Sequence, residues 1–176
     1  LATTDVGPVI DAEAKARLEG HVAAARAKNR VLWQGEVPGG DFSRGTWMAP
    51  TILRLDRPQD LTEEVFGPVL HVVTWKAEKL DEVIAAIAAT GYGLTLGIHS
   101  RIDATIRRIS ERLAVGNVYV NRNMIGAVVG VQPFGGSGLS GTGPKAGGPD
   151  YLARFALEQT ISTNTAAAGG NASLIA

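Results

Sequence analysis

The sequence predicts an α/β fold in which helices flank both faces of a parallel sheet, a three-layer arrangement. Two observations support this prediction. Apolar, β-branched segments alternate with segments whose apolar residues recur at helical spacing. The connections between them are short, which favours parallel strands joined by right-handed crossovers. The predicted strands are residues 69–75, 94–99 and 116–121, with predicted helices at 81–90 and 103–113 between them.

The first part of the chain is predicted to add one helix and two extended segments. Asp11 is a candidate N-cap, and from there to Asn29 the chain is rich in alanine, with apolar residues four positions apart. Residues 31–33 and 46–53 are typical of extended structure. The run Pro-Gly-Gly-Asp at 38–41 predicts a turn between them.

The last third of the chain changes character. Glycine is dense from Gly130 to Gly148, but the apolar residues and stiffening prolines within this stretch favour a shaped loop over a flexible linker. Residues 151–163 return to an extended pattern, in which Tyr151, Ala153 and Phe155 share one face. Residues 166–176 form a tail of small residues.

Composition excludes several classes of function. Seventeen basic residues balance seventeen acidic ones, so nucleic acid and anionic membrane surfaces are poor partners. We find no transmembrane stretch and no secretion signal, and expect a cytoplasmic protein. The absence of cysteine excludes disulfides and a thiol nucleophile within this chain. Because the sequence opens at Leu1 as if cut from something longer, we expect a fragment.

Two apparent motifs are not expected to carry chemistry. Residues 136–141 match G-x-G-x-x-G, but Pro133 and Pro144 flank the match, so no helix is expected to follow and a dinucleotide site is disfavoured. The three histidines, His21, His71 and His99, have no carboxylate or serine at supportive spacing. We expect structural or surface roles for them, and no metal site.

Two segments allow a functional interpretation. Glu63, Glu64 and Phe66 precede the predicted strand at 69, either as a plain acidic turn or as a carboxylate and ring that hydrogen-bond a sugar diol and flank a heterocycle. The glycine-rich stretch ends at Gly147 and Gly148, where exposed backbone N–H groups would converge on an anion. A linker is the alternative for this second segment.

Four motifs in order and in register resemble the aldehyde dehydrogenase superfamily. They are Glu-Glu-Val-Phe-Gly-Pro-Val at 63–69, Tyr-Gly-Leu at 92–94, Gly-Asn-Val-Tyr-Val-Asn at 116–121 and Pro-Phe-Gly-Gly at 133–136. Three further runs, at 121–130, 140–149 and 165–173, are similar to the dehydrogenase module of the proline utilization A family. That module oxidises L-glutamate γ-semialdehyde to glutamate in proline catabolism.

The resemblance implies an NAD-dependent oxidoreductase. In this family a cysteine thiolate attacks the aldehyde, hydride passes to NAD, and a glutamate-activated water hydrolyses the thioester. Because this chain has no cysteine, the nucleophile would lie upstream, and the fragment alone is expected to be inactive. FAD is possible in an upstream domain of the parent protein.

The resemblance also implies roles for individual residues. Glu64 would accept hydrogen bonds from the nicotinamide ribose, with Glu63 as the fallback, and Phe66 would line the nicotinamide pocket. Gly147 and Gly148 would offer backbone N–H groups to the substrate's α-carboxylate, and Phe155 would pack on its methylene chain. No catalytic residue and no metal ligand is expected in this chain.

The implied organisation has four parts. Residues 1–132 form part of the catalytic domain, 133–150 the substrate-anchor loop, 151–165 an oligomerisation strand and 166–176 the tail. The expected partners are an aldehyde substrate, the rest of the polypeptide and further copies of the protein. Two alternatives stay open: an inert binding or assembly module of the same fold, and a dehydrogenase for another aldehyde.

Overall fold

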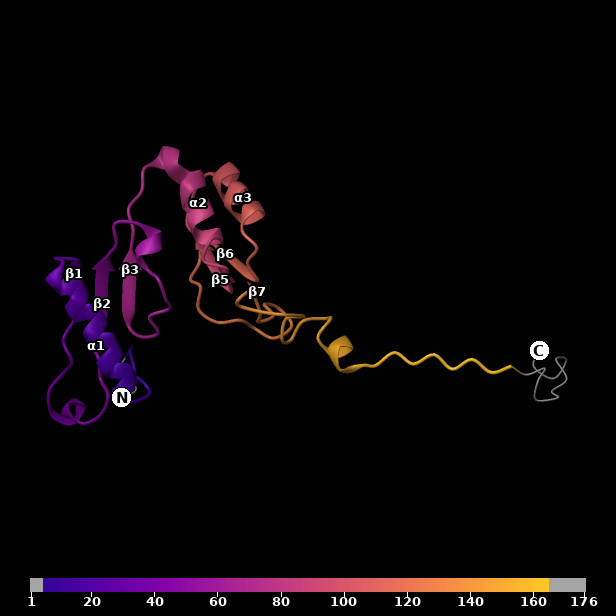
Figure 1. The fold of residues 1–176 in the computed structure, drawn as a ribbon, viewed down its shortest axis with the longest axis horizontal. Helices are drawn as coiled ribbons and strands as arrows, with labels where there is room; N and C mark the ends of the chain where they lie inside the picture. Colours follow the sequence, from indigo (N-terminus) through magenta and orange to yellow (C-terminus); the bar gives the residue numbers. More distant parts are fainter. Residues whose placement is uncertain (1–4, 165–176) are drawn as a thin grey trace. The chain divides into compact units, whose positions relative to one another are not determined.

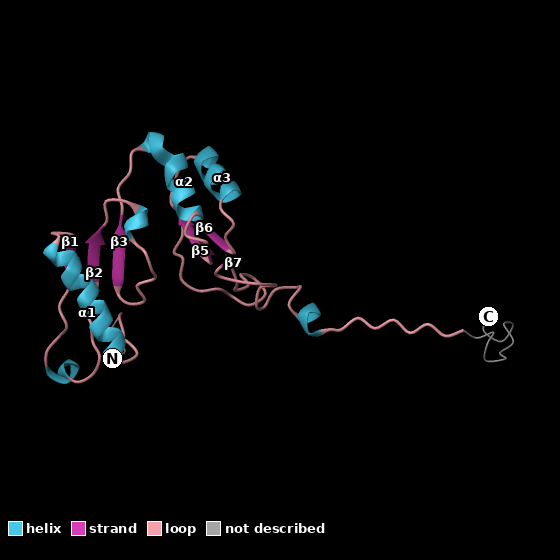
Figure 2. Cartoon of the chain, in the orientation of Figure 1, coloured by secondary structure: helices cyan, strands magenta, loops and turns pink. Residues whose placement is uncertain are grey.

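The computed structural model describes residues 5–164 (Figures 1 and 2). The chain divides into two compact units, Leu1–Gly91 and Tyr92–Ala176, and each is described by itself. The predicted tail at 166–176 lies outside the described residues. Within residues 5–164, no helix combines the length and the apolar character that crossing a bilayer requires.

The first unit is built on a three-stranded sheet in the order β1-β2-β3. The strands are β1 (Val31–Gln34), β2 (Thr51–Arg54) and β3 (Val69–Val72). β1 runs antiparallel to β2 with an irregularity in its register, whereas β2 and β3 are parallel. The β2 residues Thr51 and Leu53 are each 1% exposed, so the centre of this sheet is buried.

The predicted first helix is confirmed as α1 (Ala12–Ala27). Asp11 caps it, because its side chain accepts a hydrogen bond from the Ala14 N–H at 2.7 Å. The buried face of α1 includes Leu18 and Val22, which form a core cluster with Met48. Half-buried side chains around this cluster come from Val9, Val31, Val65 and Val69.

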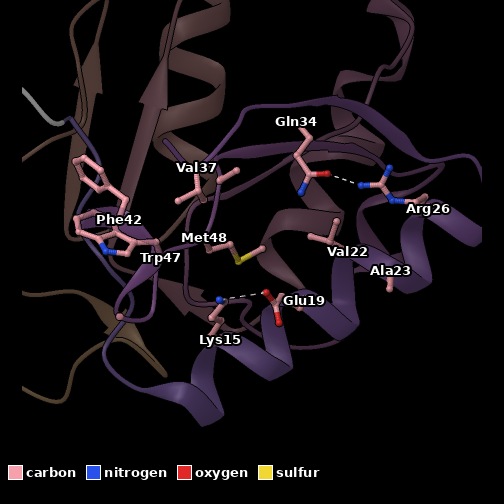
Figure 3. A pocket seen from close by; sticks show the side chains of 12 residues that line it. Lys15, Glu19, Val22, Ala23, Arg26, Gln34, Val37, Phe42, Trp47 and Met48 are labelled. Carbon is pink, nitrogen blue, oxygen red and sulfur yellow. Dashed lines mark hydrogen bonds and ion pairs between the residues drawn. The ribbon is translucent and has the colours of Figure 1, made fainter. Parts of the chain in front are cut away.

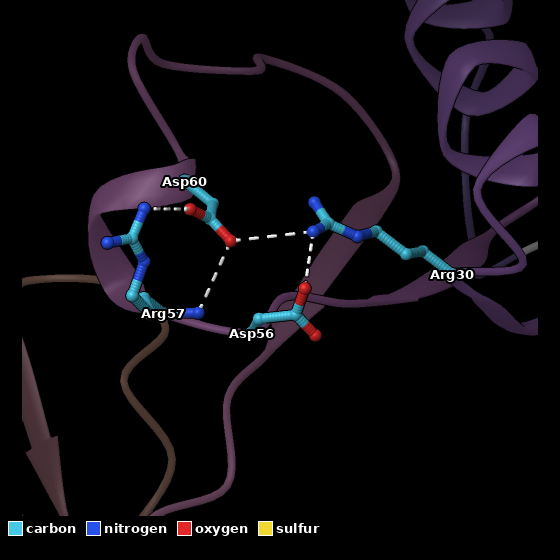
Figure 4. Close-up of polar contacts among 4 residues, drawn as sticks. All are labelled: Arg30, Asp56, Arg57 and Asp60. Atoms are coloured by element: carbon cyan, nitrogen blue, oxygen red, sulfur yellow. Dashed lines mark hydrogen bonds and ion pairs between the residues drawn. The ribbon is translucent and has the colours of Figure 1, made fainter.

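An ion-pair network joins Arg30, which directly precedes β1, to the connection after β2 (Figure 4). Arg30 reaches Asp56 at 2.5 Å and Asp60 at 3.6 Å, and Arg57 lies 3.2 Å from Asp60. Asp60 closes the short 3-10 turn η2 (Pro58–Asp60). Desolvation raises the pKa of Asp60, but hydrogen bonds from Arg57 and the charges of Arg57 and Arg30 outweigh it, so the pKa lies below its ordinary value.

The first unit ends in α2 (Leu80–Ala88), which buries Ile84 and Ala86. Two more 3-10 turns, η1 (Gly40–Ser43) and η3 (Ala77–Lys79), connect its elements. Gly91 follows α2 with a φ of +74°, the left-handed conformation with which many helices end. The predicted helix at 81–90 is therefore confirmed to within two residues at each end.

The second unit contains the expected strand-helix-strand crossover. β5 (Thr95–Ile98) and β6 (Asn117–Val120) pair in parallel, and α3 (Asp103–Arg112) connects them. A second, two-stranded sheet joins β4 (Tyr92–Gly93) to β7 (Ser137–Gly138) in antiparallel register. Asn121 closes the end of β6, because its side chain bonds both backbone groups of Ser100 at 2.9 Å.

The glycine-rich stretch is a shaped loop, as predicted. Phe134 and Ala146 exchange two backbone hydrogen bonds, of 3.0 and 2.7 Å, across it. Lys145 donates through Nζ to the carbonyl of Gly116 at 2.7 Å. The G-x-G-x-x-G match lies in β7 and the turn after it, where no helix begins, as the flanking prolines predict.

The expected parallel sheet is found in part. β3 pairs in parallel with β2 in the first unit and β5 pairs in parallel with β6 in the second, whereas β1 is antiparallel. Within the described chain, residues 151–163 do not form a strand. Leu152–Phe155 is the 3-10 turn η4, and residues 156–164 pair with no strand among residues 5–164. A segment becomes a strand only when a neighbouring edge takes its backbone hydrogen bonds, and pattern alone does not supply that edge.

Candidate functional site

The candidate cofactor residues lie in the connection between η2 and β3. Val65 is half-buried against the core cluster of Leu18, Val22 and Met48. Its two neighbours in the chain, Glu64 and Phe66, are exposed, Phe66 by 86% of its surface. The segment therefore presents a carboxylate and an aromatic ring to solvent on either side of an anchored valine. Such a pair fits a ligand that carries both a diol and a planar ring.

Gly67 brings this segment close to α1. An ideal Cβ at Gly67 would lie 2.8 Å from Cδ2 and 3.2 Å from Cγ of Leu18. The carbonyl of Pro68 accepts a hydrogen bond from the Thr51 N–H at 2.9 Å, which ties the end of the segment to β2. The chain is thus held by the sheet on one side and by a helix side chain on the other.

The structure brings together two histidines that the sequence left apart. His21 of α1 and His71 of β3 place their Nε2 atoms 2.8 Å from each other, and their rings meet edge to face with centroids 5.1 Å apart. One neutral ring donates and the other accepts, according to tautomer. They stand 50 positions apart in the chain, so spacing rules gave no signal of the pair.

The histidine pair predicts a loss of stability in mild acid. Burial lowers the pKa of His71 below 6.5, and the charge of His21 lowers it further. As the pH falls through about 6.5, the unfolded chain therefore binds a proton that folded His71 does not. The free energy of unfolding should decrease until the pH passes the folded pKa. The measurement is the thermal midpoint between pH 7.5 and 5.

His71→Gln should make that pH dependence shallower, because the glutamine does not titrate. His99→Gln, at a histidine outside the pair, is the matched control and should keep the wild-type slope. Identical slopes in the wild type and His71→Gln would contradict the assignment.

The two candidate anchor glycines differ in what their backbones already bind. The Gly148 N–H donates to the Lys145 carbonyl at 2.9 Å. Gly147 accepts at its carbonyl from Gly130 at 3.2 Å, and its own N–H has no acceptor among residues 5–164. Its φ of +74° lies in the left-handed region that favours glycine, and the Val129 Cγ1 only 3.0 Å from an ideal Cβ would have to move to admit a side chain. Gly147 is therefore the better N–H donor of the two.

Phe155 is tied to Gly148 through Tyr151. The Tyr151 N–H donates to the Gly148 carbonyl at 3.3 Å, and the Tyr151 ring packs edge to face on Phe155 with centroids 5.4 Å apart. Phe155 remains 72% exposed. Tyr151 and Phe155 were expected on one face of a strand. Their rings do lie together, but the 3-10 turn η4 brings them into contact, not strand alternation.

The candidate residues fall into two sets on different units. Glu63, Glu64 and Phe66 belong to the first unit, and Gly147, Gly148 and Phe155 to the second. Within each unit the structure brings the members of the set into one short stretch or one hydrogen-bonded cluster. In residues 5–164, no three His, Cys, Asp or Glu side chains gather as a metal site would require.

A cavity of about 440 Å³ lies in the first unit beside α1 (Figure 3). Its polar lining is already paired, because Lys15 lies 3.6 Å from Glu19 and Arg26 donates to Gln34. Phe42 and Trp47, which meet edge to face, form part of its wall. None of the candidate residues lines it, and we assign it no ligand.

Comparison with known proteins finds two groups of similar sequences. It is 58% identical to the bifunctional protein PutA of Klebsiella aerogenes over 87% of this chain and 12% of that protein. It is 43% identical to a 1-pyrroline-5-carboxylate dehydrogenase of Bacillus thuringiensis, over 90% of this chain and 30% of that enzyme.

Solved structures agree with these relatives. A PutA structure from Bradyrhizobium japonicum matches with a TM-score of 0.84 and 62% identity, over 93% of this chain and 16% of that one. A Thermus 1-pyrroline-5-carboxylate dehydrogenase with bound NAD matches with a TM-score of 0.72 and 38% identity, over 85% of this chain and 28% of that one. The chain thus spans less than a third of the length of each of these relatives. The aldehyde dehydrogenase family profile matches residues 1–161, and this chain therefore belongs to the aldehyde dehydrogenase family.

Proposed function

We propose that this chain is the C-terminal part of an NAD-dependent L-glutamate γ-semialdehyde dehydrogenase of proline catabolism. The observation that carries the proposal is the exposed Glu64 and Phe66 pair on a core-anchored segment, in a chain 58% identical to a PutA protein. The nucleophilic cysteine comes from a part of the enzyme upstream of this sequence, which contains none.

The cofactor contact in this proposal uses the first unit. NAD, when bound, accepts the hydride that aldehyde oxidation releases. The Glu64 carboxylate would accept hydrogen bonds from the ribose hydroxyls of bound NAD, and Phe66 would line the nicotinamide pocket. Both side chains are exposed, as such contacts require, and Val65 between them is held by the core.

The substrate contact uses the second unit. The Gly147 N–H points its dipole at the α-carboxylate of the semialdehyde, and Gly148 lets the chain approach closely. Phe155 packs on the methylene chain. The carboxylate contact separates this substrate from simple aliphatic aldehydes, which lack the charged group.

The proposed organisation follows the four segments 1–132, 133–150, 151–165 and 166–176. The segment 151–165 joins a neighbouring subunit of a homo-oligomer, and the exposure of Leu157 at 97% and Ile161 at 80% supports this. The three-layer parallel sheet belongs to the complete domain. The use of NAD and a cytoplasmic location remain predictions, and the sequence leaves an upstream flavin domain open.

The deciding experiment assays the full-length protein that carries this sequence. Purified protein is given NAD with glutamate semialdehyde or, separately, with an aliphatic aldehyde of similar length. Semialdehyde-dependent NADH formation at a much higher kcat/KM supports the proposal. Equal kcat/KM for both aldehydes favours a dehydrogenase for another aldehyde, and no NADH with either favours the inert assembly module.

Gly147→Ala is expected to separate the two aldehydes further. The new methyl group meets Val129 and forces a residue other than glycine to a φ of +74°, which shifts the N–H away from the carboxylate. KM for the semialdehyde should rise about tenfold while KM for the aliphatic aldehyde stays within about twofold. Steady-state kinetics on both aldehydes measure this, and an equal loss for both would remove Gly147 from the anchor.

A further inference from the structure

We infer that Leu18 of α1 is a positioning residue for the cofactor segment, acting through its contact with Gly67. The inference rests on the proposed roles of Glu64 and Phe66. α1 contributes no residue to those roles, but it supports the chain that presents them.

The first step is the closeness of the contact. Leu18 is 4% exposed, and its Cγ and Cδ2 atoms lie 3.2 and 2.8 Å from an ideal Cβ at Gly67. Real Cβ atoms essentially never lie within 3.0 Å of another carbon, so a side chain at Gly67 would force the buried Leu18 side chain to shift. Within 4 Å, the three nearest atoms to that Cβ all belong to Leu18. On the α1 side, the nearest contact of the chain at Gly67 is therefore this one side chain.

The second step is what this contact does to the neighbouring residues. Val65 and Val69, on either side of Gly67, pack against the cluster that contains Leu18 and Val22. With Val65 held inward, Glu64 and Phe66 are left exposed. We therefore expect a small displacement at Gly67 to move the carboxylate and the ring together, because both lie within three residues of Gly67 in the same segment.

The third step is a second contact between α1 and the chain that follows Gly67. One turn beyond Leu18, His21 hydrogen-bonds His71, four residues beyond Gly67 along β3. The helix thus holds the segment at Gly67 and the strand that follows it. Two contacts from one rigid helix fix both the position and the direction of the chain as it enters β3.

The test is a double-mutant cycle in the full-length enzyme, with direct NAD binding by calorimetry beside the kinetics. Gly67→Ala should raise KM and the dissociation constant for NAD about tenfold, and leave KM for the aldehyde within about twofold. Leu18→Ala should raise KM for NAD about threefold. Because Leu18→Ala makes room for the new methyl group, the double variant should recover most of the affinity that Gly67→Ala loses.

Met48→Ala is the matched control, because it removes a similar volume from the same cluster but does not lie among the nearest neighbours of Gly67. It should lower the thermal midpoint but raise KM for NAD less than Leu18→Ala does. If Gly67→Ala does not fold, Leu18→Ala against Met48→Ala decides the question. Equal NAD affinity in those two variants, or in Gly67→Ala and wild type, overturns the inference. If the wild type binds NAD but does not turn over the semialdehyde, the proposed function is overturned. The effect of the variants on NAD binding can still be measured and still tests the role of Leu18.

Discussion

Gly116→Ala is expected to destabilise the protein by about 3 kcal/mol or more. An ideal Cβ at Gly116 would lie 2.7 Å from both the carbonyl carbon of Gly135 and Cα of Gly136. Both are backbone atoms, so no side-chain rotation relieves the overlap. The chain would have to separate at the point where the glycine-rich loop crosses the start of β6.

The same position carries two hydrogen bonds that such a separation would strain. The Gly116 N–H donates to Gly93 at 2.9 Å, and its carbonyl accepts from the Lys145 ammonium at 2.7 Å. The first joins β6 to β4, and the second holds the loop that contains Gly147. We therefore expect the substitution to reduce both stability and substrate binding.

The measurement is the thermal midpoint and soluble yield of the full-length protein. Gly20→Ala is the control, because Gly20 lies exposed in α1 with nothing within 4 Å of an added Cβ. That change should be neutral or stabilise by about 0.5–1 kcal/mol. A Gly116→Ala protein that unfolds at the wild-type midpoint would contradict the packing described for the loop.

The sequence predicts the helices and strands of this fold better than it predicts which strands pair. Each helix was found close to its observed bounds, because helical periodicity and capping are local properties of the chain. Which strands pair depends on contacts between distant residues, so the antiparallel pairing of β1 and the pairing of β3 with β2 were not predicted. The turn η4 was missed for the same reason, because the alternation of residues 151–155 also fits a strand.

For the candidate site, too, the sequence pointed to individual residues but not to the contacts between distant ones. The resemblance to the family pointed to Glu64, Phe66 and Gly147, whose exposure or backbone conformation is compatible with the proposed roles. The contact of Leu18 with Gly67 joins residues 49 positions apart, and only the Gly-Pro dipeptide hinted that the chain turns closely there. The hydrogen bond from the Gly148 N–H to the Lys145 carbonyl could not be predicted either, because sequence spacing does not show which backbone N–H groups already have an acceptor.

Glu64→Gln is expected to lower kcat/KM for NAD by about 10- to 100-fold in the full-length enzyme. Glutamine has nearly the same shape and keeps one acceptor oxygen, so the change removes chiefly the negative charge. Hydrogen bonds to a charged group contribute about 1.5–3 kcal/mol, more than those between neutral groups, which sets the size of the effect. Since Glu64 is exposed and outside the core cluster, the thermal midpoint should not change.

Glu63→Gln is the matched control for this prediction, because it removes the same charge one residue earlier. If the carboxylate at Glu64 holds the ribose, Glu63→Gln should change kcat/KM for NAD by less than about twofold. If Glu63→Gln lowers kcat/KM for NAD and Glu64→Gln does not, the ribose contact belongs to Glu63, which lies at a bend two residues before Val65. Wild-type kinetics in both variants would remove this segment from the cofactor site, because a ribose contact through either acid must respond to the loss of its charge.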